Sequence, residues 1–217
     1  MRQVGGKRSA PQQARAQRTR AELLRAAAEV FAEQGFFATT LTAITDRAGV
    51  TLGAVYFHFR NKEELAREIV QQQPERVRPV LEELRSDGLQ FAVDVTLGWA
   101  HLVVDDVFLL AGARLVMDQE FFMNGEQNSH QQWTEVLLES LFEARRRREM
   151  RTAVDAEALA RLIVNACTGA QMHAHLETER RDLPQRVRDM WLCLLPAVAT
   201  PAALSKIEMD ESRYTSR

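Results

Sequence analysis

One short segment constrains the fold more than any other part of the chain. Residues 40–62, TLTAITDRAGVTLGAVYFHFRNK, read as a short helix, a tight turn and a second short helix. The first helix has one apolar face, because apolar side chains recur at three- and four-residue spacing, at Leu41, Ile44 and Ala48. Gly49 suits the left-handed backbone just past a helix end, and the Thr51 hydroxyl can cap the helix that follows. The pattern predicts a helix–turn–helix.

The second helix of this motif indicates contact with DNA. Val55 and Phe59 face inward at the helical repeat, so Tyr56 and His58 point elsewhere. In helix–turn–helix proteins the second helix enters the major groove. We assign His58 and Lys62 to phosphates. The candidate DNA-binding residues are Thr40, Thr51, Leu52, Gly53, Tyr56, His58 and Lys62.

The flanking residues complete a small three-helix domain. The pattern predicts an amphipathic helix from Arg15 to Gln34, which Gly35 stops. Residues 17–70 resemble the DNA-binding domain of TetR-family transcriptional repressors, and the run GVTLGAVYFHFRNKEEL carries the resemblance. The resemblance implies a regulator that binds double-stranded operator DNA.

The same run is similar to one branch of that family, the γ-butyrolactone receptors of antibiotic-producing actinomycetes. That branch typically reads GVTKGALYFHF followed by K-E-x-L-A, and residues 62–66 here read KEELA. Leu52 stands where the branch commonly has lysine, and leucine offers only apolar contact, for instance to a thymine methyl. Either the operator differs from the common one, or base reading falls to Thr51, the Gly53 backbone and Tyr56. The departure also leaves open a pseudo-receptor that recognises antibiotics or their intermediates.

The distribution of charge agrees with DNA binding, although the net charge of −2 hides it. Residues 1–62 carry a net charge of +6 and the remainder carries −8. A basic first third on an acidic body is expected of a DNA-binding module attached to a second domain. The first twenty residues contain six basic side chains and no acid. Residues 1–16 are interpreted as a flexible basic arm, which either follows the DNA or is simply a solvated tail.

Length and composition predict an all-α protein of two domains. The chain has 217 residues, and 46% of them are hydrophobic, enough for a large core. We expect the helix–turn–helix domain and its connecting helix over residues 17–73, a ligand-binding and dimerisation domain over 74–205, and a frayed tail over 206–217. No apolar run has transmembrane length and no signal peptide is apparent, so we expect a cytoplasmic protein without a membrane partner. Cys167 and Cys193 are expected to be reduced core thiols.

Beyond the first domain the pattern is helical. The expected helices cover approximately residues 63–73, 76–84, 89–104, 107–117, 129–148, 156–179 and 182–199. The last two have wide apolar faces, which the resemblance places in a four-helix interface between two copies. Dimerisation is also needed physically, because one small helix–turn–helix covers too few base pairs to be specific. We therefore expect a homodimer on a palindromic operator, with one or two such dimers per operator.

The central helices carry the candidate effector site. The resemblance implies a small lactone- or furan-like signal with a short alkyl tail, and Trp133 matches the tryptophan that the receptors place over their ligand. Apolar walls would hold the tail, and Gln171, Thr168 or Arg114 would bind the head group. The candidate ligand-binding residues are Phe91, Val95, Trp99, Leu110, Arg114, Trp133, Thr168 and Gln171. Phe121, Phe122 and Met123 are expected to form a lid, and the helix from Lys62 to Gln73 is the expected lever to the DNA.

Other functions fit the sequence less well. There is no G-x-S-x-G motif, no glycine-rich phosphate loop and no clustered set of cysteines and histidines. His173 and His175 are two residues apart, so they point to different sides of a helix. We therefore expect no enzyme, no metal site and no cofactor. An architectural DNA-binding protein without a ligand is the alternative, but it leaves the large acidic body unexplained.

Overall fold

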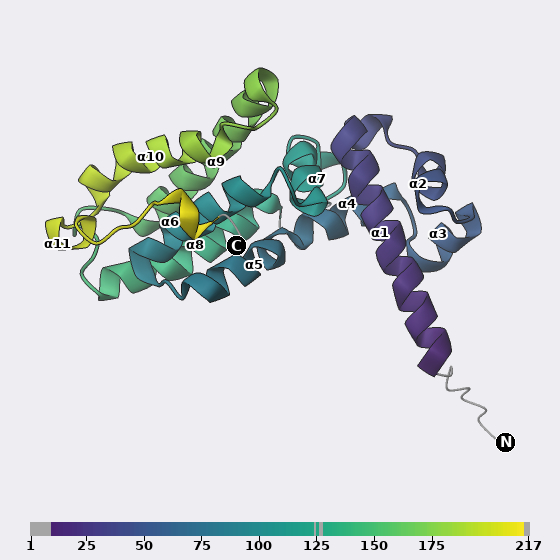
Figure 1. The fold of residues 1–217 in the computed structure, drawn as a ribbon, viewed down its shortest axis with the longest axis horizontal. Helices are drawn as coiled ribbons and strands as arrows, with labels where there is room; N and C mark the ends of the chain where they lie inside the picture. The colour runs from purple at the N-terminus through teal and green to yellow at the C-terminus, as the bar shows by residue number, and fades with distance from the viewer. Residues whose placement is uncertain (1–9, 124, 126–127, 215–217) are drawn as a thin grey trace.

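The computed structural model describes residues 10–123, 125 and 128–214, and it is helical throughout, which confirms the all-α prediction (Figure 1). Four helices form the first domain: α1 (Ala10–Ala38), α2 (Leu41–Ala48), α3 (Leu52–His58) and α4 (Lys62–Gln71). The second domain contains α5 (Gln73–Leu84), α6 (Gly88–Leu102), α7 (Val107–Leu115), α8 (Ser129–Arg146), α9 (Ala156–Thr178), α10 (Leu183–Val198) and α11 (Pro201–Leu204). Short 3-10 turns lie at η1 (Gln119–Phe121) and η2 (Glu211–Arg213).

The helix–turn–helix forms as its sequence predicts. The Thr40 hydroxyl accepts a hydrogen bond from the Ala43 amide at 3.1 Å and so caps α2. Gly49 ends that helix with φ of 66°, a left-handed conformation that glycine adopts without steric cost. The Thr51 hydroxyl caps α3 by accepting from the Ala54 amide at 3.4 Å, and Asn61 caps α4 in the same way.

Helix α1 is longer than predicted at both ends. It begins at Ala10, so residues 10–16 are helical and do not belong to a flexible arm. Residues 1–9 of that predicted arm lie outside the described residues. At Gly35 the helix is interrupted by a backbone with φ of 74°, which agrees with the predicted stop, and a helical conformation then continues to Ala38. The interruption turns the Gly35 carbonyl toward Thr39, whose hydroxyl donates to it at 2.7 Å.

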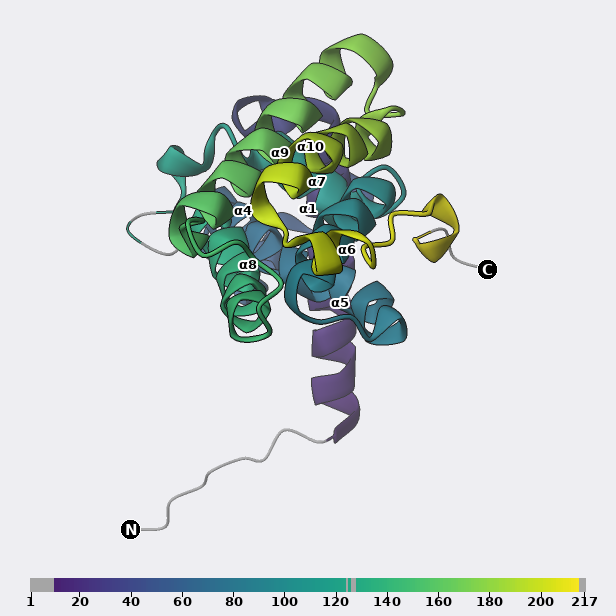
Figure 2. The ribbon, with the colours of Figure 1, turned by 90° about the vertical axis from the view of Figure 1, so that its left-hand side faces the viewer.

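Two apolar cores hold the molecule together. The larger core surrounds α6, which packs against α5, α8 and α10 (Figure 2). The smaller core contains the buried side chains of the DNA-binding domain, such as Phe31, Ile44 and Phe59. It also includes Phe108 and Leu115 from α7, because α7 packs against α1 and α4. The two domains therefore share one continuous apolar contact through α7.

The connecting region differs from the prediction. We expected the helix after the DNA-binding domain to close before Pro74, but α4 ends at Gln71 and α5 begins at Gln73. Pro74 lies in the first turn of α5, where its missing N–H removes no hydrogen bond. The two helices are thus separated by Gln72 alone.

The predicted frayed tail is wrong for residues 206–214. Tyr214 is buried, and its hydroxyl donates to the carboxylate of Asp94 at 2.6 Å. Arg213 pairs with the same carboxylate at 3.0 Å. Asp94 is fully buried in α6, and a buried carboxylate needs such partners. The sequence pattern missed this anchor because Asp94 and Tyr214 are far apart in the chain.

The predicted lid is also wrong. Phe122 and Met123 are buried in the smaller core with the DNA-binding domain. The Phe122 ring lies 5.0 Å from the Phe36 ring, and the Phe121 ring lies 4.8 Å from that of Phe37, measured between centroids. These apolar side chains are in a polar segment because they dock on the first domain.

Three further observations complete the fold. No single helix among the described residues is long and apolar enough to cross a membrane, and only α6 and α7 together, bent by 100°, have the required length and composition. Cys167 is buried, and burial raises the pKa of its thiol to about 12. Cys193 is exposed, so the prediction of a second core thiol is wrong.

Candidate DNA-binding and effector sites

The outer face of α3 is apolar and aromatic. Leu52, Tyr56 and Phe57 expose 43%, 58% and 62% of their surfaces, although Val55 and Phe59 from the same segment are buried. Large side chains that remain mostly exposed on a short helix are available to contact another molecule. The predicted residues Leu52, Gly53 and Tyr56 are exposed together on this face, and Phe57 is an exposed residue that the sequence analysis did not select.

Lys62 is engaged inside the protein. Its ammonium donates to the backbone carbonyls of Phe36 at 2.8 Å and Thr39 at 2.9 Å. It also lies 4.4 Å from the centre of the Phe36 ring. The side chain therefore ties the start of α4 to the end of α1, which the sequence analysis did not foresee. One N–H of the ammonium remains for the predicted phosphate contact.

We expect Lys62→Met to lower the free energy of unfolding by about 1–3 kcal/mol, because two carbonyls lose a charged donor while the apolar stem is kept. Urea denaturation of the two proteins measures the difference. Arg60→Met is the matched control, since Arg60 is exposed in the loop just before α4. Equal stabilities of Lys62→Met and the unsubstituted protein would show that these hydrogen bonds contribute nothing.

His58 is less suited to phosphate binding than its position in the sequence indicated. Burial lowers the pKa of its imidazole below the ordinary value, and the nearby Arg20 guanidinium lowers it further. The shift favours the neutral imidazole in the free protein. A neutral side chain releases no counterion, so its contact with DNA would not change the dependence of affinity on salt.

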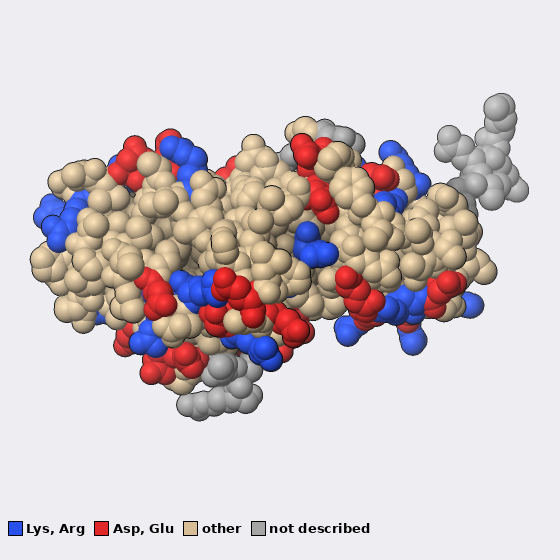
Figure 3. All heavy atoms as spheres, turned by 90° about the horizontal axis from the view of Figure 1, so that it is seen from above, with Lys and Arg blue, Asp and Glu red and all other residues tan. Residues whose placement is uncertain are grey.

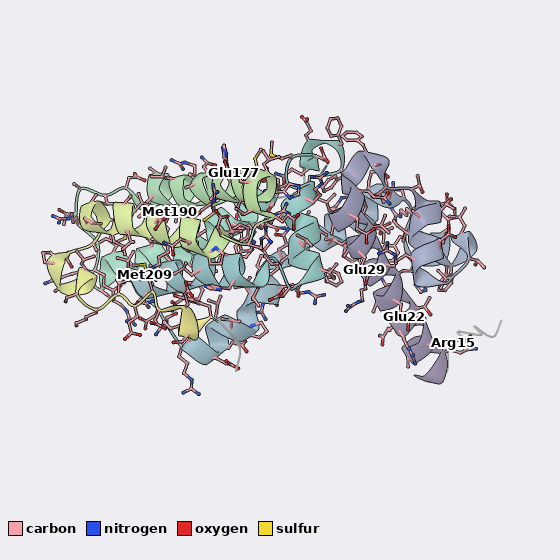
Figure 4. The ribbon with its side chains drawn as sticks, turned by 45° about the horizontal axis from the view of Figure 1, so that its top comes forward. Arg15, Glu22, Glu29, Glu177, Met190 and Met209 are labelled. Carbon is pink, nitrogen blue, oxygen red and sulfur yellow. The ribbon has the colours of Figure 1, made fainter. Side chains whose placement is uncertain are left out.

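Many basic side chains of the first domain are paired internally. Arg18 pairs with Glu22, Arg25 with Glu29, Arg20 with Glu68, and Arg47 with Glu29 and Glu33. Arg15, Glu22 and Glu29 follow one another along α1 (Figure 4). Within residues 12–62, Arg15 and Arg60 are the arginines for which the described residues offer no carboxylate within 4.0 Å. The excess positive charge of the first domain is consequently carried by the few basic side chains that have no carboxylate partner.

The second domain contains an apolar pocket that opens to solvent, with a volume of about 550 Å³ when the open space at its mouth is included. It lies among α6, α7, α8 and α9, with Gln73 of α5 at its wall. Its lining residues are Gln73, Val95, Thr96, Trp99, Gly112, Ala113, Val116, Ser129, His130, Trp133, Leu137, Ile163, Val164, Cys167, Thr168 and Gln171.

Five of the eight predicted ligand-binding residues line this pocket: Val95, Trp99, Trp133, Thr168 and Gln171. Phe91, Leu110 and Arg114 do not. Phe91 packs against the larger core and lies one helical turn before the lining residue Val95 on α6. Arg114 follows the lining residues Gly112 and Ala113, and at 100° per residue it points to another side of α7. It donates instead to His175 Nε2 at 3.0 Å.

The polar side chains along one wall of the pocket form a hydrogen-bonded series. The Thr168 hydroxyl donates to the Val164 carbonyl at 2.9 Å and lies 3.2 Å from His130 Nε2. His130 Nδ1 lies 3.1 Å from the Gln119 side-chain nitrogen. An imidazole protonated on Nε2 satisfies both contacts, and burial lowers the pKa of His130, which favours this neutral form.

The four histidines with shifted pKa values predict a pH dependence. Burial holds the pKa values of His58, His101, His130 and His175 below the ordinary value. The unfolded chain therefore binds more protons near and below pH 6.5, so stability is full above that pH and falls as the pH decreases through the folded values. Urea denaturation should give a lower free energy of unfolding at pH 5.5 than at 7.5, and His130→Gln should reduce the difference. Equal or greater stability at pH 5.5 would contradict the assignment.

Comparison with known proteins identifies the family. Residues 23–69 match the description "Bacterial regulatory proteins, tetR family", and residues 86–200 match "Tetracyclin repressor-like, C-terminal domain". The chain belongs to the TetR family. It is 32% identical to the A-factor receptor protein of Streptomyces griseus over 200 residues, which cover 91% of this chain and 70% of that protein.

Solved structures agree with this assignment. The TetR regulator TylP from Streptomyces fradiae superposes with a TM-score of 0.76 at 36% identity, covering 91% of this chain and 95% of TylP. A γ-butyrolactone receptor superposes with a TM-score of 0.71 at 30% identity, covering 88% of this chain and 94% of the receptor. The protein is therefore a DNA-binding transcriptional regulator of the TetR family, which is not a family of enzymes, and it is similar to the γ-butyrolactone receptors as its sequence indicated.

The C-terminal domain of this TetR-family chain has an exposed apolar surface on α9 and α10. Leu162, Met172 and Leu176 of α9 and Leu192 of α10 are exposed, Leu176 by 80%. Figure 3 looks onto this side of the molecule, where charged side chains gather mostly along the margins. Trp191 of α10 is fully buried and donates to the Thr96 hydroxyl at 2.8 Å. We name the four exposed side chains the α9–α10 face.

Proposed function

We propose that the protein is a ligand-responsive repressor that binds a palindromic operator as a homodimer and is released by a small hydrophobic signal. The observation that supports the proposal is the apolar pocket, because Trp133 and four other predicted residues line it in a chain whose α3 has exposed side chains available to contact DNA. The similar A-factor receptor and γ-butyrolactone receptor suggest a lactone-like signal with an alkyl tail.

Two contacts connect the pocket with the DNA-binding domain. First, Gln73 lines the pocket and is two residues beyond the end of α4. Second, the Gln119 side chain holds both Ser129 and His130 at the pocket, and the segment that follows it places Phe122 in the smaller core. Arg67 of α4 donates to the Phe122 carbonyl at 3.0 Å. A ligand that moves either wall of the pocket would thus displace α4, the predicted lever.

Ligand-induced release requires that the ligand bind the DNA-incompetent arrangement more tightly. Typical coupling is on the order of 1–3 kcal/mol, or about five- to 150-fold in operator affinity. The architectural alternative predicts no such coupling, although it too would use α3. Fluorescence anisotropy of a labelled operator during titration with alkyl γ-butyrolactones tests the proposal. Release with increasing lactone supports it, and unchanged anisotropy at saturating lactone counts against this class of signal.

Tyr56→Ala should reduce operator affinity by about 1–3 kcal/mol, because the ring and hydroxyl are exposed on α3 where DNA would contact them. The melting temperature should not change, since the side chain has little packing to lose. Phe37→Ala is a matched control, because Phe37 is an equally exposed aromatic residue of the same domain outside α3. Normal operator binding by Tyr56→Ala would remove Tyr56 from the contact surface.

A further inference from the structure

Two arginines face a single histidine near the contact between α7 and α1. Arg114 Nη1 lies 3.0 Å from His175 Nε2, and Arg180 Nη1 lies 2.9 Å from Nδ1 of the same ring. A guanidinium group only donates hydrogen bonds, and a neutral imidazole has one acceptor nitrogen. At most one of the two contacts is therefore a hydrogen bond, and the other sets one N–H against another. We name these three side chains the Arg114–His175–Arg180 group.

The positive charge of this group has no anionic partner in the part of the chain that the structure describes. Neither Arg114 nor Arg180 forms an ion pair there, and the nearby Glu179 is exposed. Arg180 exposes only 6% of its surface, and its other contact is the neutral Gln171 side-chain oxygen at 3.2 Å. Burial lowers the pKa of Arg180, and the Arg114 charge lowers it further. A buried charge is costly without a counter-charge, so this arrangement favours an added anion.

The His175 imidazole fills the space that such an anion needs. Its two ring nitrogens are separated by nearly the same distance as the two oxygens of a carboxylate. A carboxylate in place of the ring would therefore present one acceptor to each arginine, and hydrogen bonds between guanidinium groups and oxyanions are strong. Arg114 and His175 are partly exposed, so the ring can turn outward and a ligand can enter from solvent.

We propose that the Arg114–His175–Arg180 group is a binding site for a small oxyanion, a carboxylate or a phosphate group, which replaces the imidazole between the two guanidiniums. Neither Arg114 nor Arg180 lines the apolar pocket. The site is thus separate from the proposed effector site, and the inference does not depend on release by a lactone.

The position of this site connects it with both domains. A Cβ on Gly35 would lie 3.3 Å from Arg114 Nε, so the Arg114 side chain lies against the break in α1. On the other side, Arg180 donates to Gln171, which lines the apolar pocket. An anion that draws the two arginines together therefore acts on the contact with the DNA-binding domain and on the pocket wall.

Thermal unfolding with simple anions tests the site. The full chain is melted in a Bis-tris chloride buffer near neutral pH, and again with sodium phosphate or sodium acetate replacing chloride at equal ionic strength. An anion that binds the folded protein stabilises it by mass action, so at least one of the two should raise the melting temperature by about 2–8 °C. A rise with phosphate alone assigns a phosphate group, and a rise with acetate alone assigns a carboxylate. No rise with either anion would overturn the inference.

Substitutions separate a bound anion from a general effect of salt. Arg114→Met and Arg180→Met each keep an apolar stem and remove one guanidinium, so each should lose most of the rise. Arg181→Met is the matched control and should keep it, because Arg181 is the adjacent, exposed arginine and donates to the Thr178 carbonyl at 3.0 Å. An equal rise in all three variants and the unsubstituted protein would mean an adventitious ion only and would overturn the inference.

His175→Ala provides a check that does not depend on how well the arginine variants fold. Without the imidazole, the two guanidiniums face a space that an anion can fill without first displacing the ring. The rise in melting temperature should therefore be larger in His175→Ala than in the unsubstituted protein. A smaller rise, or none, would overturn the inference, because the imidazole itself would then be required at this position.

Discussion

A chain carrying both Leu162→Glu and Leu176→Glu is expected to be monomeric and to lose on the order of 100- to 1000-fold in operator affinity. The two leucines are exposed by 50% and 80% on the α9–α10 face. In a dimer formed through the α9–α10 face, each substitution buries a glutamate in the apolar contact between the two protomers. A carboxylate there is neither solvated nor paired, so the substitution is unfavourable. Without the dimer, the two helix–turn–helix domains are no longer joined. Each protomer then binds its half of the operator alone.

The measurements for this prediction are sedimentation equilibrium and operator anisotropy on the same samples. Val104→Glu is the matched control, because Val104 is exposed by 43% and lies between α6 and α7, off the α9–α10 face. Both proteins should fold, since the substituted side chains are exposed. A double variant that remains dimeric and binds the operator normally would move the interface to another surface.

Trp133→Ala is expected to keep operator binding and to raise the lactone concentration that gives half-maximal release at least tenfold. The indole forms part of the pocket wall, and α3 lies in the other domain, so the substitution alters the pocket without changing α3. Loss of an aromatic wall weakens ligand binding by about 2 kcal/mol or more, which is at least tenfold. Trp133→Phe should restore most of the response.

The readout is the lactone concentration that gives half-maximal release of a labelled operator. Far-ultraviolet circular dichroism and the melting temperature check that the variant is folded. Release of Trp133→Ala at the same concentration as the unsubstituted protein would show that the effector site lies elsewhere and that Trp133 only fills the core.

The first domain could be predicted largely from its sequence because its signals are local. Gly49, Thr51 and Asn61 each act on neighbouring backbone, and the structure places all three as caps. The role of Lys62 could not be predicted in the same way. Its carbonyl partners, Phe36 and Thr39, are brought to it by the break at Gly35, which is a tertiary arrangement.

The pocket was only partly predictable for a related reason. The spacing of apolar residues identifies the apolar faces of α6 and α7, but it does not identify which side of a buried helix meets a cavity. Phe91 and Val95 are four residues apart and so lie on the same side of α6, yet only Val95 lines the pocket. Gly112 and Gln73 carried no sequence signal, because their importance comes from the contact between two helices. The buried tail residue Tyr214 escaped prediction for the same reason, since its partner Asp94 is in α6.

The central claim is that this chain reads a two-fold symmetric operator as a dimer. Selection of bound sequences from a random DNA pool, followed by sequencing, tests it most directly. We predict enrichment of an inverted repeat whose half-sites are spaced for two recognition helices, with enrichment lost in the variant carrying both Leu162→Glu and Leu176→Glu. Recovery of sequences without any common motif, with the affinity of the pool unchanged after selection, would contradict the claim and favour an architectural DNA-binding protein.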